Sequence, residues 1–207
     1  MISKHYFLEI NEALINMFKK RIFTFRTLTA DTFALISGLP ASINARRQNR
    51  ISPAFAEKLR LAATSVNRCV YCSYGHTILA MRAGLTREEI DNLLNGETES
   101  SVDEHEAPGL LFAQHYAETA GRPESRMLYQ LYTLYGPQQA KDILTYLREI
   151  QFGNLCGNTF EAFLNRLKGN AASGSNPVFE AVFFILNLPV LGPLHILMRR
   201  GKRTIVK

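Results

Sequence analysis

The sequence of 207 residues contains no tryptophan and only three cysteines. Small secreted domains that depend on disulfides use more cysteines, in even number, so the chain does not fit that class. A signal peptide has a continuous apolar stretch, whereas Glu9, Asn11 and Glu12 interrupt the first segment of this chain. We therefore expect a cytoplasmic protein. In that compartment, two neighbouring cysteines are more often catalytic, redox-active or metal-binding than structural.

Negative charge is scarce at both ends of the chain. Residues 1–50 contain eight Lys or Arg and three Asp or Glu, and residues 199–207 contain five Lys or Arg and no acid. The middle of the chain has a net charge of −4. Basic ends can contact nucleic acid or an anionic membrane, but a solvated surface is the simpler interpretation. We expect no nucleic-acid partner.

The sequence also lacks sustained alternation of apolar and polar residues, which is typical of half-buried strands. Apolar residues recur instead at helical spacing, as at Phe55, Leu59, Ala62 and Val66. The sequence therefore predicts an all-α fold. Helices are expected at about 6–30, 53–66, 70–83, 86–96, 108–121, 124–135 and 138–168, with a polar, turn-rich connection at 37–53.

Several expected boundaries carry a local signal. Gly84 is suited to end a helix, and Thr86 with Glu89 forms a capping-box pattern that opens the next one. Gly136 and Pro137 together predict a break before the long helix at 138–168. We expect one helical domain at residues 1–170, followed by a linker and an apolar, basic tail at 171–207.

The tail segment at 178–198 is long and apolar enough to suggest a membrane span. Pro189, Gly192 and Pro193 would interrupt such a span near its middle. We therefore favour two short helical pieces that pack over the body or over a neighbouring subunit. Contact with a membrane by this tail is the less favoured alternative.

Four residues carry the chemistry of the sequence: Glu57, Cys69, Cys72 and His76, in the pattern E-x11-C-x2-C-x3-H. Residues three or four apart share a helix face, so a helix here would place Cys72 one turn from both Cys69 and His76. The thiolate is the reactive form of cysteine, and a base or a helix N-terminus nearby favours it. Spacing alone places Glu57 opposite the apolar stripe and predicts that it is exposed.

The run CVYCSYGHTILAMRAGLTREEIDNL, with Glu57 twelve positions before the first cysteine, resembles the carboxymuconolactone decarboxylase-like family. Within that family it is similar to the alkylhydroperoxidase D-like branch, which has the C-x-x-C pair. The resemblance covers about residues 38–95. It implies an all-helical, AhpD-like bundle that assembles as a homo-oligomer, commonly a trimer or hexamer. The true decarboxylases of the family lack the cysteine pair, which argues against lactone decarboxylation here.

The resemblance also implies a dithiol peroxidase for antioxidant defence that needs no cofactor. Cys72 would attack the hydroperoxide, Cys69 would form the disulfide with it, and Glu57 with His76 would relay protons. An external dithiol or a disulfide reductase would supply the electrons. Peroxidase members of the family often have a second histidine between the cysteines, where this sequence has Tyr71. A phenol is a poor base at neutral pH, so this departure affects the relay.

Other functions fit the same residues. A protein thiol–disulfide relay without peroxidase activity is one alternative, and a redox-responsive binding protein that is not an enzyme is another. Zinc binding would need two more ligands beyond the pair, from Cys156, His105 or His115, and none of them has the spacing of a zinc finger. We interpret Cys156 as a buried, small apolar residue.

Overall fold

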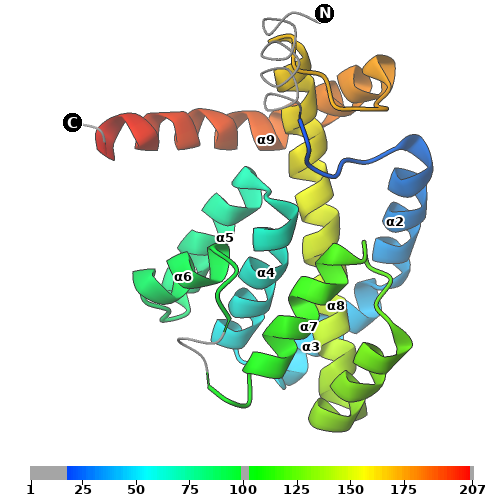
Figure 1. Ribbon diagram of the computed structural model, residues 1–207, viewed down its shortest axis with the longest axis vertical. Coiled ribbons are helices and arrows are strands. Elements are labelled where there is room, and N and C mark those ends of the chain that lie inside the picture. Colours follow the sequence, from blue (N-terminus) through cyan, green and yellow to red (C-terminus); the bar gives the residue numbers. More distant parts are fainter. Residues whose placement is uncertain (1–17, 99–102, 206–207) are drawn as a thin grey trace, which may run out of the picture.

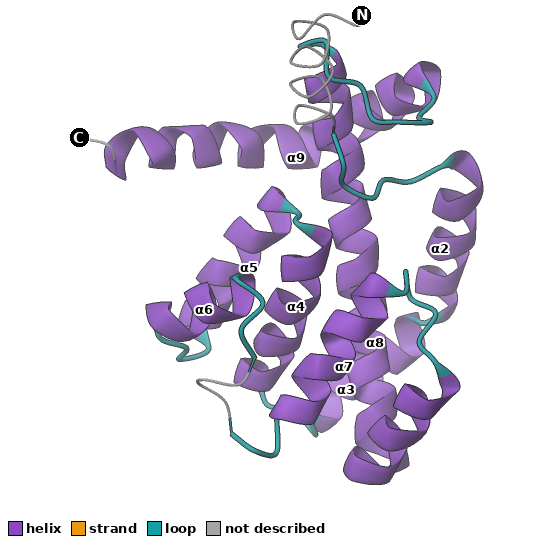
Figure 2. Ribbon diagram, in the orientation of Figure 1, coloured by secondary structure: helices purple, strands orange, loops and turns teal. Residues whose placement is uncertain are grey.

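A computed structural model describes residues 18–98 and 103–205, and within these ranges the chain forms eight α-helices and no strand (Figure 2). The predicted all-α class is therefore confirmed. Oligomeric assembly remains a prediction. The helices are α2 (Phe25–Ser37), α3 (Leu39–Gln48), α4 (Pro53–Asn67), α5 (Val70–Arg82), α6 (Arg87–Leu94), α7 (Ala107–Glu118), α8 (Ser125–Arg166) and α9 (Pro177–Ile205).

Local sequence signals explain where the central helices begin and end. In α4, Pro53 occupies the first turn, and the Ser52 hydroxyl accepts a hydrogen bond from the backbone N–H of Phe55. Thr86 and Glu89 form the predicted capping box of α6. Gly84, just after α5, has a φ of +98°, which favours glycine over other residues. The helices that surround the cysteine pair are thus fixed locally by the sequence.

Helix α4 is the centre of the fold and packs against α5, α6, α7 and α8 (Figure 1). Its inward side chains are fully buried, as Leu59, Leu61 and Ala62 show. Leu110 and Ala113 from α7, with Ile143 and Leu147 from α8, complete the same apolar core. Burial of an aliphatic side chain of this kind stabilises the fold by about 1.5–3 kcal/mol. A rigid α4 therefore gives any side chain that it carries a well-defined position.

Helix α8 runs along the whole body and is kinked near its start. Gly136 has φ +70° and ψ 169°, outside the helical region, and Pro137 follows it. These two residues divide α8 into two helical segments, which confirms the predicted break. Helix α8 packs against α3, α4, α5 and α9.

Two expectations for the first fifty residues need correction. The connection expected at 37–53 contains a regular helix, α3, because Pro40 stands in its first turn and Asn49 ends it in the left-handed conformation. The helix expected at 6–30 lies outside the described residues as far as residue 17. Residues 18–24 are not helical, since Thr24 caps a helix that begins only at Phe25.

The tail also differs from expectation. It forms one helix, α9, through both Pro189 and Pro193, rather than two short pieces. Inward side chains on both sides of the prolines, Phe183 and Leu194 among them, pack against the rest of the protein. This packing offsets the hydrogen bonds that the prolines remove. Residues 177–200 are long and apolar enough to cross a membrane by length and composition.

Candidate active site at the start of helix α5

Cys69 is the N-terminal cap of α5. Arg68 ends α4 in the left-handed conformation with φ +56°, so the chain turns sharply before the cysteine. The Sγ atom of Cys69 then accepts a hydrogen bond of 3.2 Å from the backbone N–H of Cys72. The predicted helix start next to the pair is confirmed. The sulfur of Cys69 lies where the unpaired N–H groups of a helix favour negative charge.

Cys72 opens onto a surface pocket of about 390 Å³. The pocket also contains the side chains of His76 and Glu57, so three of the four candidate residues meet in it. Cys72 is half-buried, whereas Cys69 is fully buried behind it. The complete lining is Arg46, Glu57, Arg60, Cys72, His76, Leu79, Glu149, Ile150 and Gly153. A small molecule that enters this pocket can therefore reach Cys72 but not Cys69.

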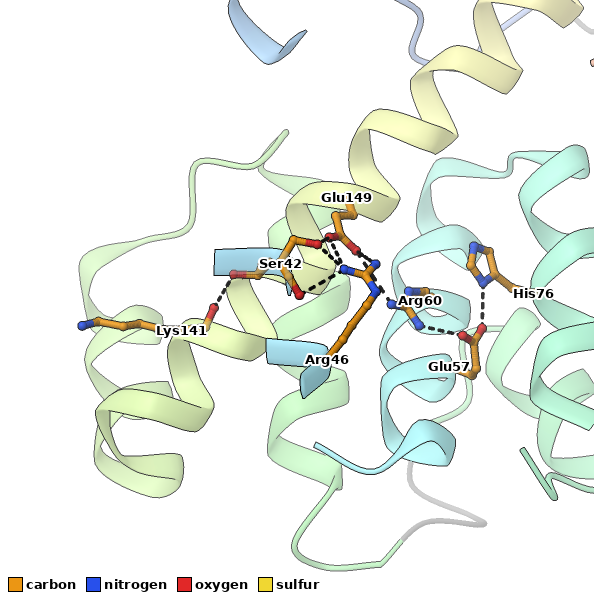
Figure 3. A network of polar contacts seen from close by, with 8 residues as sticks. Ser42, Arg46, Glu57, Arg60, His76, Lys141 and Glu149 are labelled. Carbon is orange, nitrogen blue, oxygen red and sulfur yellow. Dashed lines mark hydrogen bonds and ion pairs between the residues drawn. The ribbon is translucent and has the colours of Figure 1, made fainter. Parts of the chain in front are cut away.

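Glu57 and His76 are in direct contact, with 2.7 Å between Oε2 of Glu57 and Nδ1 of His76 (Figure 3). The other carboxylate oxygen, Oε1, accepts a hydrogen bond of 2.6 Å from Arg60. Glu57 is only 8% exposed, so the expectation of an exposed residue is wrong. Helix α5 packs on this side of α4, and His76 and Arg60 cover the carboxylate.

A chain of charged groups continues from Arg60 across three helices. Its Nη2 lies 3.8 Å from Oε2 of Glu149 in α8, and Glu149 also pairs with Arg46 of α3 at 2.7 Å. The Arg60 guanidinium stacks over the ring of Tyr146, 4.6 Å from its centroid. The sequence analysis missed Arg46, Arg60 and Glu149. Only Arg60, three residues after Glu57, had a local signal.

The two thiols are unequal because they share a hydrogen bond. Burial alone would raise the pKa of Cys69, but a hydrogen bond from the Cys72 thiol and the N–H groups of Cys72 and Tyr71 lower that pKa below its ordinary value. The pKa of Cys72 is raised well above its ordinary value by the same bond to Cys69 and by burial. The pair thus favours one thiolate, on Cys69, with Cys72 as the hydrogen-bond donor.

Glu57 stays ionised in spite of its surroundings. Burial raises the pKa of its carboxyl group, but the hydrogen bond with His76 and the charge of Arg60 outweigh burial and lower the pKa overall. An ionised carboxylate against Nδ1 orients the His76 ring and leaves its other nitrogen, Nε2, to exchange protons.

Tyr71 does not line this pocket; it is 3% exposed and packs edge-on against Phe160. Its hydroxyl is 2.9 Å from Nδ1 of His195 in α9. Burial raises the pKa of Tyr71, so its phenol is neutral and does not act as a base. With Phe184, Leu191 and other side chains of α9, Tyr71 helps to cover Cys69.

Two of the remaining candidates lie apart from the pocket. Cys156 is half-buried, and burial together with nearby Cys69 raises its pKa to about 12. The ring of His115 accepts a hydrogen bond at Nε2 from the backbone of Glu124, which fits a structural role. Within residues 18–98 and 103–205, no three His, Cys, Asp or Glu side chains are grouped so that they could hold a metal ion.

Comparison with protein families points to the same four residues. The site is that of a helical protein with a dithiol at a helix N-terminus and a Glu–His pair beside it. Residues 30–102, which include all four candidate residues, match the model of the carboxymuconolactone decarboxylase family. The spacing of Cys69 and Cys72 is consistent with its AhpD-like branch. No curated protein and no solved structure matches the chain.

Proposed function

We propose that the protein is a dithiol peroxidase that reduces hydroperoxides through a Cys69–Cys72 thiol–disulfide cycle. The observation that carries this proposal is the Glu57–His76 hydrogen bond of 2.7 Å in the same pocket as Cys72. A peroxidatic thiol needs a group that removes its proton and a group that protonates the departing alkoxide. One histidine oriented by a carboxylate serves both needs.

The cycle balances with these groups. The Cys72 thiolate attacks the terminal oxygen of ROOH, so that an S–O bond forms, the O–O bond breaks, and the alkoxide takes a proton from His76 to leave as ROH. Cys69 then attacks the sulfenic sulfur of Cys72, which forms the disulfide and releases water. An external dithiol reduces that disulfide and is itself oxidised.

The first thiolate of the pair is on Cys69, whereas the pocket exposes Cys72. We assign the attack to Cys72 because the fully buried Cys69 sulfur is out of reach of a substrate in the pocket. When the substrate arrives, the proton of Cys72 passes to His76, which returns it to the departing alkoxide. Cys69 then acts as the resolving thiol.

The direct test is consumption of an organic hydroperoxide in the presence of a small dithiol. Wild type should turn over, and Cys72→Ser should fall to the uncatalysed rate. Cys69→Ser, treated with the hydroperoxide before any dithiol is added, should hold a trappable sulfenic acid where wild type forms the disulfide. Cys156→Ser is the matched control and should keep wild-type activity, because that thiol lies outside the pocket. Equal rates for wild type and Cys72→Ser would disprove the assignment.

A second candidate is a thiol–disulfide relay between proteins. The observation that favours it is the neutral, buried Tyr71 in the position between the cysteines, which leaves only one proton-transfer group beside the pair. Oxidation or reduction of a protein disulfide without consumption of organic hydroperoxides would support this candidate over the peroxidase.

A further inference from the structure

One side of α9 faces solvent and is entirely apolar. Its exposed side chains recur at helical spacing and are between 52% and 73% exposed. We call this surface the outer face of α9, defined by Val178, Val182, Ile185, Leu186, Val190 and Leu197. The helix passes the end of α8 and extends beyond it on the side of α5 (Figure 1).

The polar residues of α9 between 178 and 198 number three, and none of them is on the outer face. Glu180 is fully buried and pairs with Arg166 at 2.6 Å. His195 contacts the Tyr71 hydroxyl, and the Asn187 side chain donates to the backbone carbonyl of Phe183. The three polar side chains of this segment therefore contact the protein itself, and the exposed side chains of the outer face are all apolar.

A continuous apolar surface of this length is unusual for an unpartnered soluble protein and indicates an interaction site. Residues 177–200 also have the length and hydropathy of a membrane span. A span is incompatible with the contacts just described, because the Glu180–Arg166 ion pair and the Tyr71–His195 contact hold α9 against α8 and α5. A binding partner can therefore contact only the outer face of α9, because the opposite side packs against the protein.

Charge indicates which partner fits. Residues 199–207 contain five Lys or Arg and no acid, and Glu180, the one acidic residue after Glu161, is buried. Burial lowers the pKa of His195, and the charges of Arg199 and Lys168 lower it further, while Glu161, which pairs with Lys20 at 2.6 Å, opposes them. Three basic side chains and one carboxylate therefore lie near His195, in the second half of α9. A second copy of the chain would bring the same positive charge, whereas anionic lipid headgroups complement it.

We propose that the outer face of α9 docks on an anionic lipid bilayer, with the helix lying in the plane of the surface and the exposed Arg199 at the headgroups. An apolar helix face flanked by basic residues is the arrangement by which peripheral proteins bind such surfaces. This surface is separate from the pocket at Cys72, so lipid binding and peroxide turnover can be measured independently.

The test is flotation of the purified full-length protein with vesicles. The protein should float with equimolar phosphatidylglycerol and phosphatidylcholine, should float poorly with phosphatidylcholine alone, and should be released by high salt. Ile185→Asp/Val190→Asp, on the outer face, and Lys202→Gln/Arg203→Gln, in the basic end, should each weaken partitioning by about tenfold or more.

The matched control is Tyr129→Asp/Leu134→Asp, which places two carboxylates on exposed apolar residues of α8 far from α9 in sequence. It should float like wild type, and circular dichroism should show that all variants are folded. Absence of wild-type flotation, or equal flotation of the outer-face variant, would overturn the proposal. It would also be overturned if wild type formed a dimer without binding lipid and the outer-face variant were monomeric. Retention of wild type on the vesicles at alkaline pH would indicate a true membrane span and would likewise overturn it.

Discussion

The hydroxyl of Tyr71 lies 2.9 Å from Nδ1 of His195, across 124 residues of sequence. This contact joins Tyr71, one of the two residues between the cysteines, to the C-terminal helix. The same helix places Leu191 and Leu194 against the cluster that buries Cys69. One sulfur of the pair is therefore covered by the tail, while the other opens onto the pocket.

Removal of the Tyr71–His195 contact should expose Cys69. We expect Tyr71→Phe to lower the free energy of unfolding by about 1 kcal/mol, since one hydrogen bond is lost. It should also increase the rate at which Cys69 reacts with a thiol reagent, measured in a Cys72→Ser/Cys156→Ser background. His105→Ala, a change of an exposed histidine, serves as the control and should leave that rate unaltered.

Gly157 permits the close approach of α8 to the cysteine pair. A Cβ atom at this position would lie 2.5 Å from Sγ of Cys69 and 3.2 Å from Cδ2 of Tyr71. Gly157→Ala should therefore rotate the Cys69 side chain away from the N–H of Cys72, destabilise the protein by about 1–3 kcal/mol and slow disulfide formation.

Gly153, one turn earlier in α8, provides a matched comparison. Its Cβ would lie 3.8 Å from Sγ of Cys72, an ordinary van der Waals distance. Gly153→Ala should keep or raise the free energy of unfolding, because alanine favours a helix by up to about 1 kcal/mol over glycine. Urea unfolding measures the change in the free energy of unfolding for each variant. Equal stability of the two variants would refute the proposed role of Gly157.

Glu57 should make stability depend on pH in the acid range. Its folded pKa is lowered below the ordinary value of 4.5, so its contribution is complete above that pH and is lost as pH falls through the folded value. Glu57→Gln should cost about 1–3 kcal/mol at pH 7, and the difference from wild type should shrink towards pH 3.

Urea unfolding at several pH values measures this difference. Glu88→Gln, a change of an exposed glutamate in α6, is the comparison and should alter stability by less than about 0.5 kcal/mol. A difference between wild type and Glu57→Gln that stays constant from pH 7 to pH 3 would contradict the assignment.

Arg60 positions the relay without touching the thiols in the proposed mechanism. It holds Glu57 at 2.6 Å, and its charge helps to lower the pKa of that carboxyl. In Arg60→Met that pKa should rise, so the acid limb of the pH–rate profile for peroxide turnover should move to higher pH. Arg60→Lys should restore part of the shift.

A purely structural role of Arg60 would reduce the rate at all pH values and leave the acid limb in place. Arg87→Met, in the exposed first turn of α6, is the control for loss of a surface arginine and should not move the profile. The pH–rate profiles of these three variants and wild type therefore separate the two roles.

The helical class, the break at Gly136 and the start of α5 could all be predicted because each has a signal within a few residues: a periodicity, a cap or a breaking pair. Predictions failed where such signals competed with packing. Pro189 and Pro193 predict an interrupted tail, yet contacts of α9 with α8 and α5 maintain one helix. Glu57 has the spacing of an exposed residue, yet α5 covers it.

The sequence by itself determined the chemical groups and their local order: two sulfurs one helical turn apart, an imidazole one turn further on and a carboxylate on the preceding helix. Tertiary structure alone decided that Glu149 and Arg46 continue the Glu57–Arg60 contact, and that α9 covers one sulfur and not the other. The reason is physical, since spacing along a helix fixes which neighbours share a face, whereas contacts across about a hundred residues depend on how whole helices pack.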